Sequence, residues 1–238
     1  MPKQERAERT RETIVRAAAS VFEAEGFSAA PLSDITHRAT VTKGALYFHF
    51  SSKRELAQAV VQEAADTLRA LLDDARRRRH GRELPLQVLI DLSHSVAGRL
   101  AGDPVFRAGL RLGTDADLFP DHGGGLTVDW TGLVEELLAK AGEGSAPGAQ
   151  CPRPNPLASV LTGLELLFRR APDGIERETL TSVWRLLLSG LTRAGDPARY
   201  EPGGTVAVHG SPAGSGNTDS ADKGTGTDGA YGAHASEL

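Results

Sequence analysis

Residues 42–50 read TKGALYFHF and are followed at 51–56 by SSKREL. The first stretch predicts a short helix from Lys43 to Phe48. Ser52 and Glu55 then form an S-x-x-E pattern, in which each side chain accepts a hydrogen bond from a free backbone N–H at the start of a helix. We therefore expect a longer helix to begin at Ser52 and to continue to about residue 76.

The chain before this stretch predicts two further helices. Apolar residues spaced three and four apart indicate a helix from about Glu5 to Glu25, and Gly26 follows where a helix end commonly needs a left-handed residue. A short helix is expected from about Leu32 to Ala39. Two short helices joined by a tight turn, with a longer helix on each side, have the layout of a helix-turn-helix, at about residues 8–56.

The second short helix of such a motif lies in the major groove of DNA, with its N-terminal residues towards the base edges. Lys43 can reach guanine acceptors or a phosphate, and Lys53 lies at a helix N-terminus, where backbone N–H groups add to the attraction for phosphate. The expected partner is double-stranded operator DNA. The DNA-contact candidates are Ser33, Thr42, Lys43, Gly44, Ala45, Tyr47, His49 and Lys53.

Together with Gly26, Phe27 and the SKREL stretch at 52–56, TKGALYFHF closely resembles the TetR family of repressors. The resemblance implies an all-α homodimer with an N-terminal helix-turn-helix DNA-binding head. It also implies a larger C-terminal helical body for ligand binding and dimerisation. We expect the apolar members of the motif, Leu46, Phe48 and Phe50, to lie in the core of the head.

Two residues depart from the family pattern. Thr40 stands where the family usually has Gly, before the Val of the turn. If Thr40 adopts the same φ > 0 conformation, its β-branched side chain strains the turn by about 1–2 kcal/mol. Pro31 stands where the family often has a Thr that caps the second helix. Both departures lower the expected stability of the head rather than alter its identity.

The distribution of charge decides how the net charge of −4 is interpreted. Residues 1–54 contain nine Lys or Arg and six Asp or Glu, so the head is mildly basic and the rest of the chain is acidic. No apolar run approaches the roughly 18–20 residues that span a membrane, and no signal-peptide pattern is present. The single Cys151 suits a reducing compartment, so we expect a cytoplasmic protein without a membrane partner.

Beyond residue 76 the sequence predicts a helical body. Pro85 and Asp103-Pro104 are typical helix starts and predict helices that reach about Leu100 and Leu112. A loop is expected at 113–126 and a flexible linker at 142–153. Further helices are expected at about 127–141, 155–170 and 174–194.

The predicted domains are a head at 1–56, whose last helix continues to about 76, and a body at 77–200. Residues 201–238 are expected to form a disordered tail, because they contain too little apolar material to offset the entropy of ordering them. GTGTDG at 224–229 formally matches a dinucleotide-binding fingerprint. No strand precedes it and no helix follows, so we reject that match.

A narrower resemblance concerns the body. QERAERTR at 4–11, PVFRAGLRL at 104–112 and Trp130 at the start of a helix are similar to the γ-butyrolactone receptors of actinobacteria. In that group the matching Trp lines the pocket, and the ligands are small lactone or butenolide signals that control antibiotic production. The indole can cover an acyl lactone with its face while its N–H stays free to donate. The ligand-binding candidates are Trp130, Gln62, Thr162, Leu89, Leu110 and Leu133, of which Gln62 and Thr162 supply hydrogen bonds.

The last two long helices have broad apolar faces. Such faces on a terminal helix pair fit the four-helix dimer interface that the family resemblance implies. Trp184 is expected in the core or in this dimer helix. The apolar residues are Val160, Leu164, Leu167, Leu180, Val183, Leu187 and Leu191.

The predicted function is a repressor that binds a palindromic operator as a homodimer and is released by a small lactone-like signal. Three alternatives stay open: a pseudo-receptor that responds to an antibiotic or its intermediate, a ligand-independent DNA-binding regulator, and a lactone hydrolase. No G-x-S-x-G elbow is present and the His residues show no metal-ligand spacing, which disfavours an enzyme. We expect no catalytic residue, no metal and no cofactor.

Overall fold

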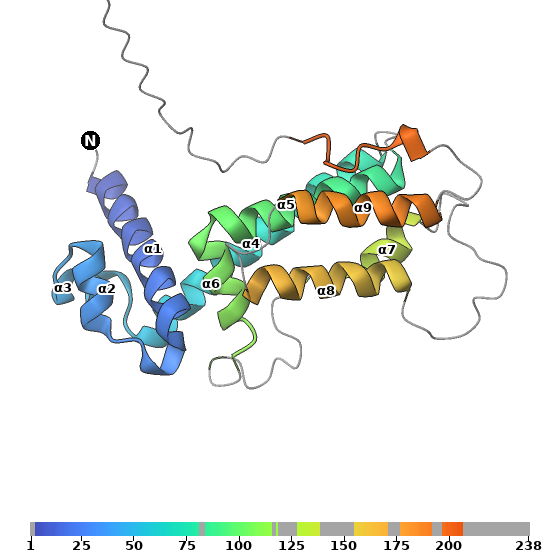
Figure 1. Ribbon diagram of the computed structural model, residues 1–238. Helices are drawn as coiled ribbons and strands as arrows, with labels where there is room; N and C mark the ends of the chain where they lie inside the picture. The colour runs from blue at the N-terminus through green and yellow to red at the C-terminus, as the bar shows by residue number, and fades with distance from the viewer. Residues whose placement is uncertain are drawn as a thin grey trace, which may run out of the picture.

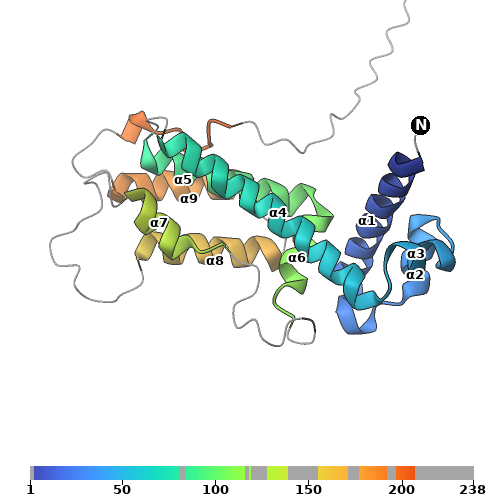
Figure 2. The ribbon, with the colours of Figure 1, turned by 180° about the vertical axis from the view of Figure 1, so that it is seen from behind.

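The computed structural model describes residues 3–80, 84–115, 118, 128–138, 155–170, 177–191 and 197–206. Over these ranges the chain is helical and contains no strand. A compact head lies at one end of an elongated helical body, and one long helix, α4 (Lys53–His80), runs from the head into the body (Figures 1 and 2). The predicted all-α architecture is confirmed.

The observed helix bounds agree with the predicted ones to within a few residues wherever the structure describes them. Most of the predicted loop at 113–126 and all of the linker at 142–153 lie outside the described residues. The head contains α1 (Lys3–Ala29), α2 (Leu32–Ala39) and α3 (Lys43–His49). The body contains α5 (Pro85–Gly102), α6 (Pro104–Leu112), α7 (Trp130–Leu138), α8 (Pro156–Arg170), α9 (Arg177–Leu191) and the single 3-10 turn η1 (Pro197–Arg199).

Side-chain caps fix the starts of several helices. The Asp103 carboxylate accepts hydrogen bonds from the backbone N–H groups of Val105 and Phe106, at 3.0 and 3.1 Å. The Asn155 side chain accepts one from the Leu157 N–H at 3.0 Å. Both caps satisfy backbone donors that have no partner within the helix, as the sequence predicted.

The predicted Ser52–Glu55 capping box is confirmed in one half and shifted in the other. Ser52 Oγ accepts from the Glu55 N–H at 3.1 Å, but the Glu55 carboxylate accepts from the Ser51 backbone N–H at 2.7 Å and from the Ser51 hydroxyl. These hydrogen bonds lower the pKa of Glu55. Glu55 therefore holds the end of α3 as well as the start of α4.

The backbone has positive φ at the two predicted positions in the head. Gly26 lies at φ 78°, and α1 kinks there. Thr40, which ends α2, has φ 56° and ψ 40°, a left-handed conformation that is unfavourable for a β-branched residue. Pro31 precedes α2 without a side-chain hydrogen bond to the helix. Both expected weaknesses of the head are present.

The head and body are joined by α6 as well as by α4. Val105, Ala108 and Leu112 on one face of α6 pack in the head core with residues of α1 and α4. Phe106 and Leu110 on its other face pack in the body core. A movement of α6 therefore displaces both cores, because close-packed interiors transmit displacement.

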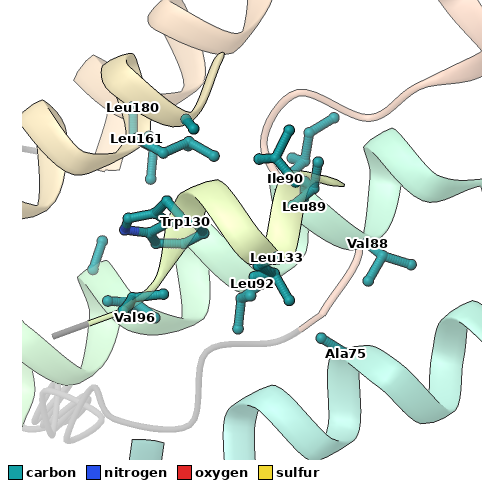
Figure 3. Close-up of a cluster of buried hydrophobic side chains, with 14 of the residues drawn as sticks. Ala75, Val88, Leu89, Ile90, Leu92, Val96, Trp130, Leu133, Leu161 and Leu180 are labelled. Atoms are coloured by element: carbon teal, nitrogen blue, oxygen red, sulfur yellow. The ribbon is translucent and has the colours of Figure 1, made fainter. Parts of the chain in front are cut away.

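The body core surrounds α5, of which most residues are buried. Helices α4, α6, α7, α8 and α9 all contact it. In the close-up of this core, Trp130 of α7 lies between Val96 of α5 and the pair formed by Leu161 and Leu180 (Figure 3). Trp184 is fully buried, so the core alternative holds for this residue.

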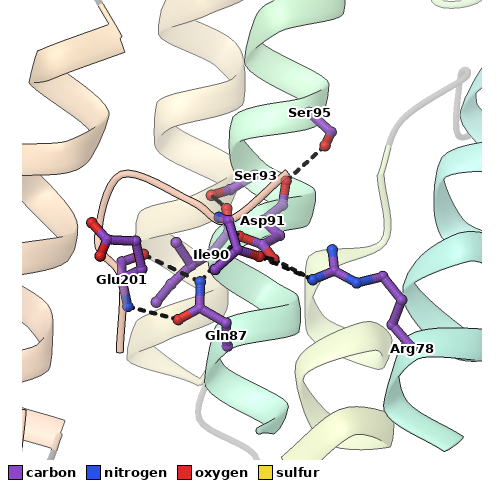
Figure 4. A network of polar contacts seen from close by, with 8 residues as sticks. Arg78, Gln87, Ile90, Asp91, Ser93, Ser95 and Glu201 are labelled. Atoms are coloured by element: carbon purple, nitrogen blue, oxygen red, sulfur yellow. Dashed lines mark hydrogen bonds and ion pairs between the residues drawn. The ribbon is translucent and has the colours of Figure 1, made fainter. Parts of the chain in front are cut away.

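Residues 197–206, here called the strap, lie along α5 after the end of α9. Gln87 bonds the backbone of Glu201 twice, and the buried Asp91 accepts hydrogen bonds from Thr205 N at 2.7 Å and Thr205 Oγ1 at 2.6 Å. Asp91 also forms an ion pair with Arg78 of α4 (Figure 4). The prediction of disorder from residue 201 is therefore wrong for 201–206, because buried polar groups rather than apolar area order this segment; 207–238 lie outside the described residues.

Candidate DNA-binding surface and ligand cavity

Helix α3 exposes one side and buries the other. Leu46 and Phe50 lie in the head core, and Lys43, Gly44 and Tyr47 are exposed. Thr42 Oγ1 accepts from the Ala45 N–H at 3.1 Å and so caps the helix. The exposed side therefore combines a cation, a phenol and a stretch without bulky side chains near the helix start.

Phe48 does not lie in the core, contrary to the prediction. Its side chain is 81% exposed, whereas Leu46 and Phe50 are 0% and 2% exposed. Leu46 and Phe50 are four residues apart and share a helix face, so Phe48, two residues from each, points to the opposite face. An exposed aromatic ring on this face is a contact candidate that the sequence reasoning missed.

The other predicted DNA-contact residues differ in how freely they can reach a phosphate. Lys53 donates to the Ser28 carbonyl at 3.1 Å and lies 5.1 Å from the Phe27 ring, and burial lowers the pKa of its ammonium despite the nearby Glu25. Ser33 is exposed and donates to Asp34. His49 is half-buried and packs edge-on against Phe48. Lys53 is thus tied to the end of α1, and Lys43 is the more accessible cation.

A cavity lies beside Trp130 in the body. It contains about 250 Å³ of empty space and is bounded by α5, α7, α8 and α9. This is smaller than the roughly 300–1,000 Å³ of ordinary ligand pockets, so a ligand has to move the walls apart. The lining residues are Ser93, Val96, Ala97, Leu100, Trp130, Leu161, Leu164, Glu165 and Leu180.

The polar groups of this cavity are paired with one another. The Trp130 indole N–H donates to Glu165 Oε2 at 2.7 Å, so it is not free as the sequence reasoning supposed. Arg169 donates to Glu165 Oε1 from Nη2 and Nε, at 2.6 and 3.0 Å. The Ser93 hydroxyl donates to the Ile90 carbonyl and accepts from the Trp184 indole. The buried Glu165 was not foreseen.

The predicted ligand-binding residues separate into two groups. Trp130 lines the cavity, and the buried Leu89, Leu110 and Leu133 pack in the same core without lining it. Gln62 is exposed and donates to Asp66, and Thr162 is exposed and donates to the Ala158 carbonyl at 2.9 Å. The two expected hydrogen-bond partners of a ligand therefore lie outside the cavity wall.

Comparisons with known proteins assign the chain to a family. Residues 14–60 match the model of bacterial regulatory proteins of the tetR family. The A-factor receptor protein of Streptomyces griseus is 34% identical over 87% of this chain and 72% of its own length. The chain belongs to the TetR family.

Solved structures place it within the γ-butyrolactone receptor group of that family. The crystal structure of a γ-butyrolactone receptor described as ArpA-like is 33% identical, covers 82% of this chain and 94% of its own, and has a TM-score of 0.64. CprB from Streptomyces coelicolor, in complex with its biological operator sequence, gives the same identity, coverage and TM-score. This TetR-family chain is therefore a DNA-binding transcriptional regulator, and none of its described helices is long and apolar enough to cross a membrane.

The regulator exposes an apolar surface on its last two long helices. Leu166 and Leu167 of α8 and Leu186 and Leu191 of α9 are between 44% and 75% exposed. Contiguous exposed apolar groups of this kind mark interaction surfaces. Leu180, which the sequence placed on this face, is instead buried and lines the cavity, because it faces α5 rather than solvent.

Hydrogen bonds connect the cavity of the regulator to its head through α6. Arg169, the partner of Glu165, donates to the Leu110 carbonyl at 3.2 Å. One turn either side, Arg107 forms an ion pair with Glu23 of α1 and Arg111 donates to the Glu23 carbonyl at 2.6 Å. Arg54 of α4 donates to the Leu118 carbonyl just beyond α6. The end of α1 is thus fixed by α6.

Proposed function

We propose that this regulator represses transcription as a homodimer on a palindromic operator and is released by a small lactone-like ligand. The observation that carries the ligand half is the Trp130 cavity, whose wall is joined to the DNA-binding head through α6. The DNA half rests on the exposed side of α3. A protein that acts on chromosomal DNA works in the cytoplasm, which is the location we propose.

The proposed DNA contacts begin at the N-terminus of α3. Lys43 contacts a guanine edge or a phosphate, and Tyr47 donates to a phosphate oxygen. Phe48 adds an apolar contact to a thymine methyl, since its ring is solvent-exposed and has no packing role. Thr42, Gly44 and Ala45 bring the backbone close to the duplex, and Ser33, His49 and Lys53 lie at the margin of this surface.

The proposed release is a population shift. Two recognition helices of a dimer must match successive major grooves about 34 Å apart. A γ-butyrolactone or butenolide that opens the Trp130 cavity displaces α8 and α6, and with them the end of α1. The ligand favours this conformation because the cavity fits it there and not in the closed form. The exposed leucines of α8 and α9 supply the dimer interface.

Gel shifts with an operator from the protein's own upstream region test both halves. Lys43→Ala should weaken operator binding and lower the slope of log K against log[salt] by about 0.9. Arg69→Ala is the matched control, because it removes an exposed cation on α4 outside the head. Trp130→Phe should bind the operator like the unmodified protein but should require more lactone for release. Exchange of these two phenotypes would overturn the assignment of roles.

Two alternatives predict other results in the same assay. If an antibiotic or its intermediate releases the operator and lactones do not, the regulator is a pseudo-receptor. If no small molecule releases it, the regulator acts without a ligand, and the cavity is only a packing defect. A lactone hydrolase would turn over the lactone, which product analysis of the same mixtures would reveal.

A further inference from the structure

The Trp130 cavity offers an incoming ligand few free hydrogen-bonding groups. Its polar members are Ser93, Glu165 and the Trp130 indole. The Ser93 hydrogen already points to the Ile90 carbonyl at 2.7 Å, and its oxygen accepts from Trp184 at 2.8 Å. The Trp130 N–H is used by Glu165. A ligand carbonyl therefore finds no donor in this wall until the Trp130–Glu165 hydrogen bond opens.

Opening that hydrogen bond leaves two groups without a partner. Glu165 is 6% exposed and Trp130 is 2% exposed, so neither can turn to water. A buried donor or carboxylate oxygen without a partner is costly, more so when it is charged. A ligand that separates the two groups has to satisfy both of them.

We infer that the ligand inserts between Trp130 and Glu165 and carries two adjacent groups: an acceptor for the indole N–H and a hydroxyl or N–H donor for Glu165. The inference rests on the proposed function, since it specifies the ligand of that site. A hydroxylated lactone meets the requirement, with its carbonyl on Trp130 and its hydroxyl on Glu165 Oε2. A lactone without a donor leaves Glu165 Oε2 unsatisfied.

The second oxygen of Glu165 links this exchange to the head. Glu165 Oε1 accepts from Arg169 at 2.6 Å, and Arg169 also donates to the Leu110 carbonyl of α6 at 3.2 Å. A displacement of Glu165 shifts Arg169, which holds the α6 carbonyl next to Arg111. The pair Glu165–Arg169 thus reports the ligand's donor to the helix that fixes Glu23 of α1.

Binding of two matched lactones tests the inference. The first is a γ-butyrolactone with an alkyl chain and a hydroxymethyl group, and the second has a methyl in place of the hydroxymethyl. The full chain should bind the first at least about tenfold more tightly, which is the size expected of a hydrogen bond to a charged group. Calorimetry measures the ratio, and gel shifts should show release at correspondingly lower concentration of the hydroxylated lactone.

Two variants assign the preference to Glu165. Glu165→Gln keeps the size of the side chain and should reduce the ratio by several-fold. The double variant Glu165→Leu/Arg169→Leu removes both buried charges together, a change that commonly preserves folding, and should bring the ratio close to one. Glu136→Gln is the control, because Glu136 also pairs with an arginine on α7 but is exposed.

A spectroscopic readout reports the Trp130 hydrogen bond directly. The chain has two tryptophans, so a sample with ¹⁵N-labelled indoles gives two N–H resonances, which Trp184→Phe assigns. The Trp130 resonance should move in Glu165→Gln and on addition of the hydroxylated lactone. Equal binding of both lactones by the unmodified protein overturns the inference and leaves the proposed function standing. An unchanged tenfold ratio in the double variant also overturns it, and binding of neither lactone defeats the proposed function itself.

Discussion

Gly109 of α6 lies so close to Ala64 of α4 that a Cβ on Gly109 would come within 2.3 Å of the Ala64 Cβ and 2.8 Å of the Val60 carbonyl oxygen. Real Cβ atoms do not approach backbone so closely, so only glycine permits this crossing. The contact sets the distance between α4, which enters the head, and α6, which packs against both cores. A methyl group at this point acts as a spacer between them.

Gly109→Ala should therefore lower the free energy of unfolding by about 1–3 kcal/mol, the usual effect of overpacking. Denaturant titration measures it. Ala64→Gly in the same chain removes one of the two clashes and should recover part of the loss, so the double-mutant cycle should give a coupling of at least about 0.5 kcal/mol. Strictly additive single effects would mean that the two helices separate freely and that the crossing imposes no constraint.

The left-handed Thr40 predicts a stabilising substitution. Its φ of 56° costs a β-branched residue about 1–2 kcal/mol, and glycine pays about 0.4–1 kcal/mol in unfolded-state entropy. Thr40→Gly should thus raise stability by up to about 1 kcal/mol, seen as a higher Tm. Thr13→Gly, at an exposed position inside α1, should instead lower the Tm. A loss of stability at both positions would show that Thr40 bears no strain.

Phe48 and Leu46 predict opposite consequences for two apolar residues of one helix. Phe48→Ala should leave stability within about 0.5 kcal/mol, because the ring is exposed, and should weaken operator binding. Leu46→Ala should cost about 2–5 kcal/mol of stability through a cavity in the head core. Thermal melts and gel shifts on both variants separate the two roles. If Phe48→Ala unfolds the head and leaves DNA binding of the folded fraction intact, the ring is a packing residue.

The sequence predicted the head well because its signals are local. The Gly26 break, the positive φ of Thr40 and the Asp103 and Asn155 caps each depend on residues a few positions apart. Phe48 was missed although its two-residue offset from Leu46 was visible, because the aromatic run was taken as one apolar unit. The helical phase of Phe48 was the signal that could have corrected the prediction.

The cavity was predicted less completely because its polar groups come from distant parts of the chain. Trp130 and Glu165 are 35 residues apart, and nothing in the sequence around Glu165 marks it as buried. Gln62 and Thr162 were chosen for their chemistry alone, and the structure points them to solvent and to their own helices. The strap escaped prediction for the same reason, since its partners Gln87 and Asp91 lie 114 residues earlier.

The strap predicts a strong dependence on Asp91. This carboxylate accepts hydrogen bonds from Thr205 and Gln87 and pairs with Arg78, and these contacts outweigh burial and lower its pKa. Asp91→Ala should cost about 3–5 kcal/mol, as expected for removal of one partner of a buried ion pair. Asp73→Ala, which breaks an exposed pair with Arg76, should cost about 0–1 kcal/mol. Denaturant unfolding compares them, and similar small losses would mean that the strap does not stabilise the body.

His94 predicts a loss of stability in mild acid. Its Nε2 bonds the Pro202 carbonyl of the strap at 2.9 Å, and its buried Nδ1 has no partner among the described residues. Burial lowers the pKa of His94, and Arg177 of α9 acts in the same direction, whereas the Pro202 bond and Asp91 oppose it. Because the folded pKa lies below the unfolded value of about 6.5, the neutral ring stabilises the fold above that pH. This contribution is lost as the pH falls from about 6.5 towards the folded pKa.

The Tm measured between pH 8 and pH 5 should therefore decline, and the decline should be smaller in His94→Gln, whose amide can still donate to Pro202 but takes up no proton. His37→Gln removes an exposed histidine of α2 and should keep the full decline. Asp91 adds no slope in this window, since its lowered pKa places its own loss of stability at more acidic pH, below about 3.9. Identical slopes for the unmodified protein and His94→Gln would show that His94 is neutral in both states over this range, and that the strap is insensitive to mild acid.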